Sequence, residues 1–224
     1  MEIDALDFRN DRRALNEAVV DRIISGKVIG WFQGRMEFGP RALGSRSILA
    51  DPRDKDMRNR LNHLVKKREA FRPFAPAILE EYANQHIDLN IPSQFMLETC
   101  QVISSLDLPA ITHVDGSCRP QTVSAQINPE FHSLLTAFYE RTNCPILVNT
   151  SFNIRSEPIV CTPLDALRCF GNSGIDVLVL GDFIIDRSVL TEKFFAMAEH
   201  EFNFIKPPQD LFSGKSIEAI YTFV

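Results

Sequence analysis

Apolar residues recur along this chain at helical spacing in some segments and as short strand-like runs in others. Within residues 11–25 they form a helical stripe, and Gly26 follows at a position suited to a helix C-cap. Residues 28–32 (VIGWF) form a short apolar run that predicts a buried strand, and this strand leads into Gly34. A helix, a strand and a glycine-containing segment in this order are typical of an α/β protein.

Helical and strand-like apolar patterns follow one another to about residue 186. They predict helices over 54–67, 129–141 and 162–171, and strands over 74–79, 96–114, 121–124, 145–148, 176–180 and 183–185. Pro76 confines the strand at 74–79 to a sheet edge or a strand end, because proline has no N–H to donate. Beyond about residue 190 the chain is rich in Phe, and we expect a docking arm there, with ordinary core packing as the equal alternative.

Length and composition are those of an ordinary globular protein, with 45% apolar and 24% charged residues in 224 positions. No apolar run reaches the roughly 18 residues of a membrane span, and the first residues show no secretory signal. Five scattered cysteines without a C-x-x-C motif fit reduced thiols rather than a zinc site or a disulfide framework. We therefore expect a cytoplasmic protein, and the net charge of −5 argues against a general nucleic-acid coat.

Positive charge is concentrated between Gly34 and Arg72, the segment called here the basic window. It holds eleven of the 24 Lys and Arg residues against five acidic ones, so its net charge is about +6 in a protein of −5 overall. Concentrating like charge costs self-repulsion, which a bound polyanion offsets. The basic window therefore predicts phosphate binding.

A glycine motif lies inside the basic window. Residues 39–45 have the G-x-x-x-x-G spacing of a P-loop, but Ser45-Arg46 stands where Lys-Ser/Thr is needed, which excludes a Walker A motif. In the alternative that we favour, the glycines let the backbone approach a phosphate while Arg35, Arg41 and Arg46 supply the charge, since the planar guanidinium binds phosphate oxygens in pairs. Surface arginines paired with nearby acids are the other interpretation.

A second cluster of cations spans residues 66–74. Lys66 and Arg68 share a face if this end of the helix is extended, and Phe71 and Phe74 would anchor the segment while Arg72 points into a cleft. A solvated helix end, whose cations complement the helix dipole, explains the same residues when they are considered alone.

Two further motifs carry polar groups next to predicted strands. His113 and Asp115 are suited to acid/base chemistry or to orienting a phosphate-binding Arg119, although two such residues do not make a metal site. Ser151 and Asn153 follow a buried strand, where α/β folds bind ligands. A satisfied structural histidine and an ordinary polar turn are the alternatives.

Taken together, four ordered motifs carry a family resemblance. The segments GRMEFGPRALGSRSILADPR, KKREAFRPFAPAIL, THVDGSCRPQTV and NTSFNIRSEPIV closely resemble the C-terminal domain of the nodulation/cephalosporin/tobramycin-type O-carbamoyltransferases, over roughly residues 25–186. This domain is similar to the YrdC-like fold, and its K-x-R…S-x-N pattern would correspond to Lys66, Arg68, Ser151 and Asn153. The chain has Ser45 where the family often has Asn, and Ser117-Cys118 where it often has Thr-Ala; neither change removes a charge.

The resemblance implies a fold and a reaction. The fold would be a single-domain α/β structure, an open twisted mixed sheet flanked by helices with a basic concave face. Such domains consume carbamoyl phosphate and ATP, with Mg²⁺, and form carbamoyl-adenylate with release of pyrophosphate. The implied site residues are Arg35, Arg41 and Arg46 on the polyphosphate, Lys66, Arg68 and Arg72 on the carbamoyl phosphate and the α-phosphorus, Arg119 on phosphate with His113 and Asp115 shaping its surroundings, and Ser151 and Asn153 on the adenylate.

The resemblance also sets expectations for domains and partners. We expect a helical lead-in over 1–24, the YrdC-like domain over 25–190 and the Phe-rich arm over 191–224. Related full enzymes carry a larger N-terminal metal-binding domain that transfers the carbamoyl group to a hydroxyl; nothing resembling it is present in these residues, so we expect such a partner domain or subunit, no membrane and no nucleic acid. The alternatives are a threonylcarbamoyl-adenylate synthase, or a non-catalytic RNA- or nucleotide-binding module.

Overall fold

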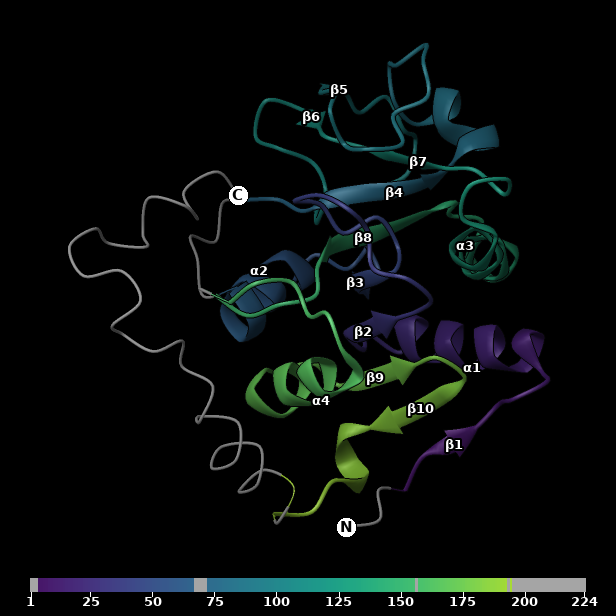
Figure 1. The fold of residues 1–224 in the computed structure, drawn as a ribbon. Coiled ribbons are helices and arrows are strands. Elements are labelled where there is room, and N and C mark those ends of the chain that lie inside the picture. Colours follow the sequence, from purple (N-terminus) through teal and green to yellow (C-terminus); the bar gives the residue numbers. More distant parts are fainter. Residues whose placement is uncertain (1–3, 67–71, 156, 193, 195–224) are drawn as a thin grey trace.

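The computed structural model describes residues 4–66, 72–155, 157–192 and 194. Its centre is an eight-stranded mixed sheet with the order β1-β10-β9-β2-β3-β8-β4-β7 (Figure 1). The strands are β1 (Leu6–Asp7), β2 (Ile29–Phe32), β3 (Arg46–Ala50), β4 (Ala75–Leu79), β7 (Gln121–Val123), β8 (Ile146–Ser151), β9 (Val177–Leu180) and β10 (Phe183–Asp186). The pairs β2–β9 and β4–β7 are parallel and the other neighbours are antiparallel.

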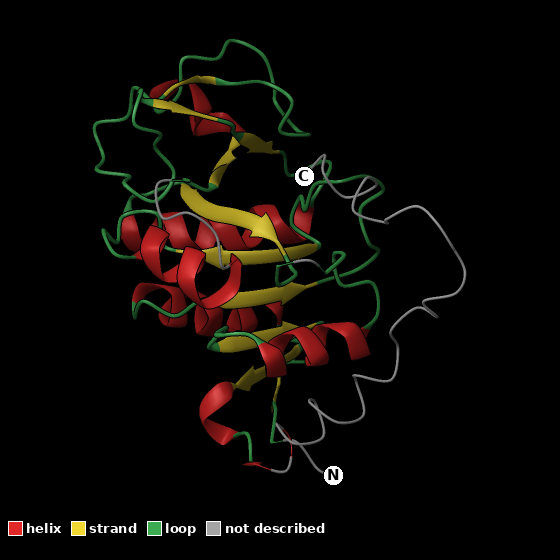
Figure 2. Ribbon diagram, turned by 90° about the vertical axis from the view of Figure 1, so that its left-hand side faces the viewer, coloured by secondary structure: helices red, strands yellow, loops and turns green. Residues whose placement is uncertain are grey.

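Helices flank the sheet on both sides. They are α1 (Arg12–Ile24), α2 (Met57–Leu61), which continues as a π-helical turn (Asn62–Lys66), α3 (Pro129–Thr142) and α4 (Pro163–Asn172), with short 3-10 helices at Glu80–Gln85 and Arg187–Val189. Figures 1 and 2 show α1 and α3 on one side of the sheet and α2 and α4 on the other. The α/β class expected from the sequence, an open mixed sheet flanked by helices, is confirmed.

Local sequence explains how the helices begin. Asn128 accepts a hydrogen bond from the Phe131 amide at the start of α3. At the start of α4, Thr162 and Asp165 form a reciprocal capping box and Pro163 occupies the first turn. These caps satisfy backbone N–H groups that have no partner inside the helix.

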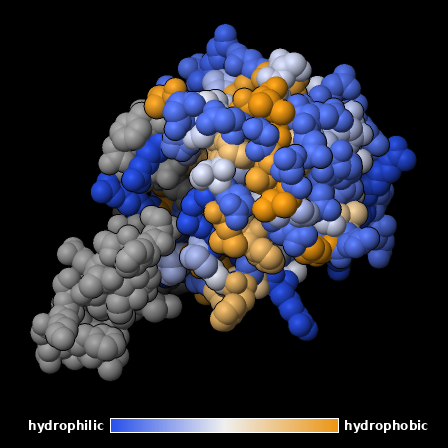
Figure 3. Space-filling view, turned by 90° about the horizontal axis from the view of Figure 1, so that it is seen from above, coloured by the Kyte–Doolittle hydropathy of each residue, from blue (hydrophilic) through white to orange (hydrophobic). Residues whose placement is uncertain are grey.

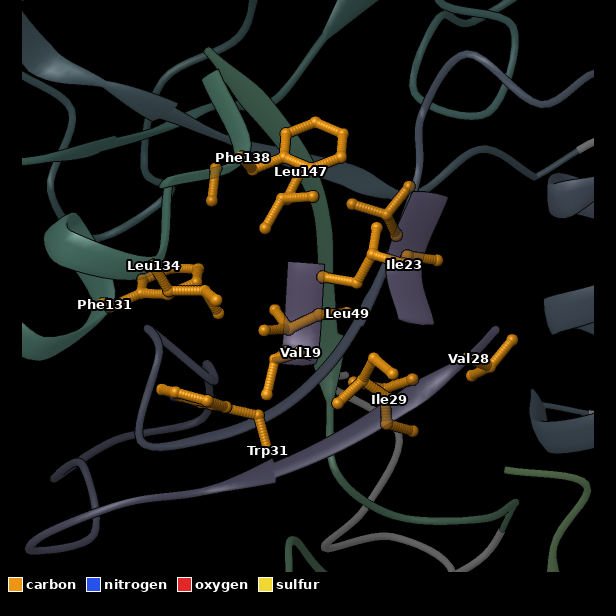
Figure 4. Packing of buried hydrophobic residues seen from close by; sticks show 14 of the residues in the cluster. Val19, Ile23, Val28, Ile29, Trp31, Leu49, Phe131, Leu134, Phe138 and Leu147 are labelled. Carbon is orange, nitrogen blue, oxygen red and sulfur yellow. The ribbon is translucent and has the colours of Figure 1, made fainter. Parts of the chain in front are cut away.

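The hydrophobic core fills both faces of the sheet, and one half of it lies between the sheet and the pair α1 and α3. Val19 and Ile23 of α1 and Phe131 of α3 meet alternate residues of β2, Ile29 and Trp31, and all are fully buried (Figure 4). Because successive side chains of a strand point to opposite faces, Gly30 faces the other side. The predicted helical lead-in is therefore part of the main core.

Two predicted strands, at 74–79 and 96–114, differ from their expected form. The strand β4 lies inside the sheet, between β8 and β7, and its pairing with β7 begins at Ala77, one residue after Pro76. The proline is the second residue of β4, in register with Val148 of β8, and therefore lies close to a strand end, one of the two places predicted for it. The expected strands over 96–114 are reduced to β5 (Cys100–Gln101), which pairs with β6 (Ser117–Cys118) in a separate two-stranded sheet. Val102 adds one isolated bridge to Ile87, and the rest of the segment consists of loops and turns.

The region around β5 and β6 carries exposed apolar side chains. Figure 3, seen from above, shows such residues grouped among hydrophilic ones over this end of the molecule. They include Phe95, Leu97, Ile103 and Val114, each more than half exposed. The same region also contributes buried residues to the main core, among them Leu108, Ile111 and Cys118.

The cysteines are free thiols in very different surroundings. Cys161 is exposed, Cys100 is half-buried, and Cys118, Cys144 and Cys169 are buried. Burial raises the pKa of the Cys144 thiol to about 11 and raises that of Cys118 further.

We expect brief alkylation of the native protein, read by mass spectrometry, to label Cys161 first and Cys100 more slowly, because the thiolate is the reactive form. Labelling of Cys144 as fast as Cys161 would contradict this order, and the urea-unfolded protein, in which all five react, is the control.

Candidate functional site

The sheet topology brings the predicted site segments to one edge, called here the site edge. The strands β2, β8 and β9 end there and β3, β4 and β7 begin there, since Phe32 pairs with Arg46, and Ser47 pairs with Ser151. Residues 33–45, called the glycine loop, connect β2 to β3 across this edge. Arg72 lies three residues before the first residue of β4, and Arg119 lies two residues before that of β7, so both belong to the same edge.

Arg41 of the glycine loop and Arg119 lie close enough for their charges to interact. Both are half-buried. The pKa of Arg119 is lowered, first by burial and then by repulsion from Arg41. Neither guanidinium has an ion pair within the described part of the chain. Two neighbouring guanidinium groups without a paired carboxylate are chemically suited to binding an anion.

The other predicted cations divide into two groups. Arg35 and Arg72 are exposed, and the Arg72 carbonyl accepts a hydrogen bond from Asn62 Nδ2 at 3.0 Å. Lys66 ends the π-helical turn after α2, whereas its side chain and all of Arg68 lie outside the described residues. The shared face proposed for Lys66 and Arg68 therefore stays a prediction.

The structure corrects the prediction for Arg46. This side chain is only 4% exposed, and its guanidinium lies 3.5 Å from the centre of the Phe32 ring. It donates to the carbonyl oxygens of Gln33, Ser45, Gly34 and Cys161 at 2.7–3.4 Å. A guanidinium committed in this way holds the base of the glycine loop and is not free to bind a polyphosphate.

Part of the basic window is neutralised within the fold. Arg53 pairs with Asp51 at 2.6 Å, and Arg60 pairs with Asp176 at 2.8 Å. Arg60 also donates to the Gly26 carbonyl, which links α2 to the end of α1. Because these two arginines are paired with carboxylates, only part of the charge of the basic window is available to a ligand.

Ser151 and Asn153 lie side by side where β8 ends. The Ser151 hydroxyl donates to Asn153 Oδ1 at 2.7 Å, and Asn153 Nδ2 donates to the Glu157 carbonyl at 2.7 Å. Both side chains are half-buried. Phe152 between them is fully buried and packs over Gly30, where a Cβ would lie 2.7 Å from the ring. The motif thus turns two polar side chains to the site edge while its aromatic residue anchors the segment in the core.

His113 and Asp115 belong to an exposed turn before β6 rather than to a strand. Asp115 accepts from the Ser117 hydroxyl at 2.7 Å and from its amide at 3.0 Å, and these bonds lower the pKa of Asp115. The side-chain bonds of Asp115 thus stay within the turn and do not reach Arg119. Among the described residues, Asp115 forms no ion pair with Arg41 or Arg119.

Sequence reasoning missed the amides that hold the glycine loop. Asn149 Nδ2 donates to the Ala42 carbonyl at 3.1 Å and to Gln121 Oε1 at 2.7 Å, and Gln121 Nε2 donates to the Leu43 carbonyl at 2.8 Å. Asn128 Nδ2 reaches the same carbonyl at 3.2 Å. Asn149 and Gln121 are almost fully buried. An asparagine directly after the apolar run Ile146–Val148 was the available signal, because a buried polar side chain must find partners.

No metal cluster accompanies these residues. The described ranges contain no group of three or more His, Cys, Asp or Glu side chains that could hold an ion. A surface hollow lined by Asp7, Arg9, Asn10 and Asp182 contains none of the predicted site residues.

Within the part of the chain that the structure describes, no helix is long and apolar enough to span a membrane.

Comparison with known proteins identifies the family. The family described as "Carbamoyltransferase C-terminus" matches residues 20–187, and the chain belongs to it. The chain is 47% identical to the nodulation protein NolO of Bradyrhizobium diazoefficiens, 51% to the nodulation protein NolNO of Sinorhizobium fredii, and 40% to the 3'-hydroxymethylcephem-O-carbamoyltransferase of Amycolatopsis lactamdurans, over 71–75% of its own length. It spans only a quarter to a third of the length of these relatives.

A solved structure supports the fold. Full-length HypF in its phosphate- and nucleotide-bound form matches 76% of this chain and 25% of its own, with a TM-score of 0.54 at 18% identity. The YrdC-like fold class is thereby confirmed. The family match favours neither of the alternatives, a threonylcarbamoyl-adenylate synthase or an RNA- or nucleotide-binding module.

Proposed function

We propose that this chain binds ATP and carbamoyl phosphate at the site edge and forms carbamoyl-adenylate. The observation that carries the proposal is the pair Arg41 and Arg119, two neighbouring guanidinium groups without an ion pair in the described residues. A terminal phosphate brings about −1.5 to −2 charges near neutral pH, so two phosphorylated substrates require several cations together. Family membership supports the carbamoyl group as the transferred unit.

The reaction needs no covalent nucleophile from the protein. Carbamoyl phosphate is hydrolysed to carbamate and phosphate; a carbamate oxygen then attacks the α-phosphorus of ATP, and the bond to pyrophosphate breaks. Positioning and fixed positive charge can provide the catalysis, because negative charge accumulates on the phosphorus oxygens in the transition state.

Apart from His113 and Asp115, each predicted site residue has a proposed place in this scheme. Arg41 and Arg119 bind the polyphosphate, with Arg35 at the exposed rim of the loop, and the hydroxyl and amide of Ser151 and Asn153 contact the adenylate. We retain for the carbamoyl phosphate the cations Lys66, Arg68 and Arg72. Because Arg46 is buried, its proposed role is to fix the base of the glycine loop.

Mg²⁺ is expected to arrive with the nucleotide. This ion is commonly held by one or two carboxylates together with substrate phosphates and water. The described residues offer no cluster of three or more ligating side chains, so we assign no step to a protein-held ion. Transfer of the carbamoyl group to a hydroxyl acceptor is proposed to need a partner domain of the kind that makes up the rest of the longer relatives.

The test is ATP–pyrophosphate exchange by the purified chain, with and without carbamoyl phosphate. We expect label from pyrophosphate to enter ATP only when carbamoyl phosphate is present, and added threonine with bicarbonate to have no effect. Exchange that depends on threonine, or no exchange at all together with salt-sensitive RNA binding, would contradict the proposal.

A further inference from the structure

The carboxylate of Glu37 accepts hydrogen bonds from backbone amides of the glycine loop. Its Oε1 atom accepts hydrogen bonds from the amides of Leu43 at 2.7 Å, Ser45 at 2.8 Å and Arg46 at 3.3 Å. The intervening amide, that of Gly44, donates to Ser47 Oγ at 3.0 Å. Four consecutive backbone N–H groups are therefore used inside the protein.

Converging backbone amides of this kind are what a P-loop or a similar nest offers to a phosphate. Here an internal anion fills that position. The side chain of Glu37 is partly buried, and its second oxygen, Oε2, is buried without a hydrogen-bond partner among the described residues. The negative charge of Glu37 also raises the pKa of Arg46, against the larger lowering by burial.

The carbonyl side of the same segment is held as well. Asn149 binds the Ala42 carbonyl, and Gln121 binds that of Leu43. Trp31 Nε1 donates to the Gly44 carbonyl at 2.8 Å. With both its N–H and C=O groups engaged, this segment has little freedom to move onto a ligand.

We infer that Glu37 is a positioning residue that fixes the glycine loop by taking the place of a phosphate, so that substrate phosphates are bound by the guanidinium groups and not by the loop amides. This inference deepens the proposed function and rests on it for the identity of the phosphates. The hydrogen-bonded loop would then keep Arg41 in a fixed position, since this residue precedes the first of the bonded amides by two residues. The glycines serve the folding of the loop rather than a close approach of backbone to ligand.

Amide hydrogen exchange of the free protein tests the loop part without any substrate. In Glu37→Ala, exchange of the Leu43, Ser45 and Arg46 amides should accelerate by about tenfold or more, since each loses a bond to a charged group. Acetate at high concentration should restore protection by entering the vacated position. The matched control is Glu17→Ala, which removes an exposed acid paired with Arg13 on α1.

Two conservative variants keep the test decisive if Glu37→Ala does not fold. Glu37→Gln retains an oxygen acceptor at the same reach and should keep most of the protection. Glu37→Asp retains the charge but is shorter by one methylene, and it should lose protection. Equal exchange in all variants and the parent protein would overturn the inference.

Pyrophosphate binding tests the ligand part. Titration calorimetry with pyrophosphate should show about tenfold weaker binding to Glu37→Ala, because Arg41 is no longer held beside Arg119. Tighter binding would show that the freed amides are themselves the phosphate site and would overturn the inference. If the variants lose amide protection as expected but the parent protein neither binds pyrophosphate nor catalyses exchange, the role of Glu37 in holding the loop stands and the proposed function fails.

Discussion

Replacing Arg119 with alanine is expected to lower carbamoyl phosphate-dependent ATP–pyrophosphate exchange by about 10²–10³-fold. The guanidinium is half-buried beside Arg41, so it acts where water screens charge poorly. Loss of one such cation leaves the charge that develops on the phosphorus oxygens without its partner. Initial rates at saturating ATP and carbamoyl phosphate, with the thermal midpoint of each protein, make the measurement.

Two controls sharpen this prediction. Arg119→Lys keeps a positive charge but not the planar fork, and we expect it to recover only part of the rate. Arg13→Ala removes an exposed arginine on α1 and should leave exchange unchanged. Rates for Arg119→Ala within about threefold of the parent protein, at equal thermal stability, would remove Arg119 from the site.

Gly44→Ala is expected to destabilise the protein by about 2–5 kcal/mol, the sum of backbone strain and overpacking. The residue has φ +104°, a conformation that L side chains rarely adopt. A Cβ there would lie 2.2 Å from Phe131 Cδ1, and that ring is fully buried between α1, α3 and the sheet. The steric clash cannot be relieved by a rotation of the Phe131 ring, because the surrounding core is closely packed. Urea unfolding followed by tryptophan fluorescence measures the loss.

Gly34→Ala is the matched control in the same loop. Gly34 also has a positive φ, +49°, but nothing lies within 4 Å of a Cβ placed there. We expect a cost of only about 1–2 kcal/mol from the left-handed conformation. Equal losses for the two variants would mean that packing against Phe131 does not constrain the loop.

The helices were predictable because their signals are local. The stripe at 11–25 became α1, and the Thr162-Pro163 start became α4 with its capping box. The strand β3 was missed, because the short run Ser47–Ala50 has no period of its own, and it is a strand through pairing with β2 and β8. For residues 96–114 the error was the reverse: strands were predicted, but the segment contains only the two-residue strand β5. It lies outside the main sheet, where β6 is its paired strand.

The family and the α/β class could both be inferred from residue order, because motif spacing and hydrophobic periodicity are properties of neighbouring positions. Residue order could not show which cations remain available to a ligand. Arg60 is neutralised by Asp176, 116 positions away, and Arg46 is bound by the Cys161 carbonyl, 115 positions away. Arg41 and Arg119 come close enough to repel each other because β2, β3, β4 and β7 begin or end at the same sheet edge. Charge pairing and burial depend on distances in space, and the fold sets those distances.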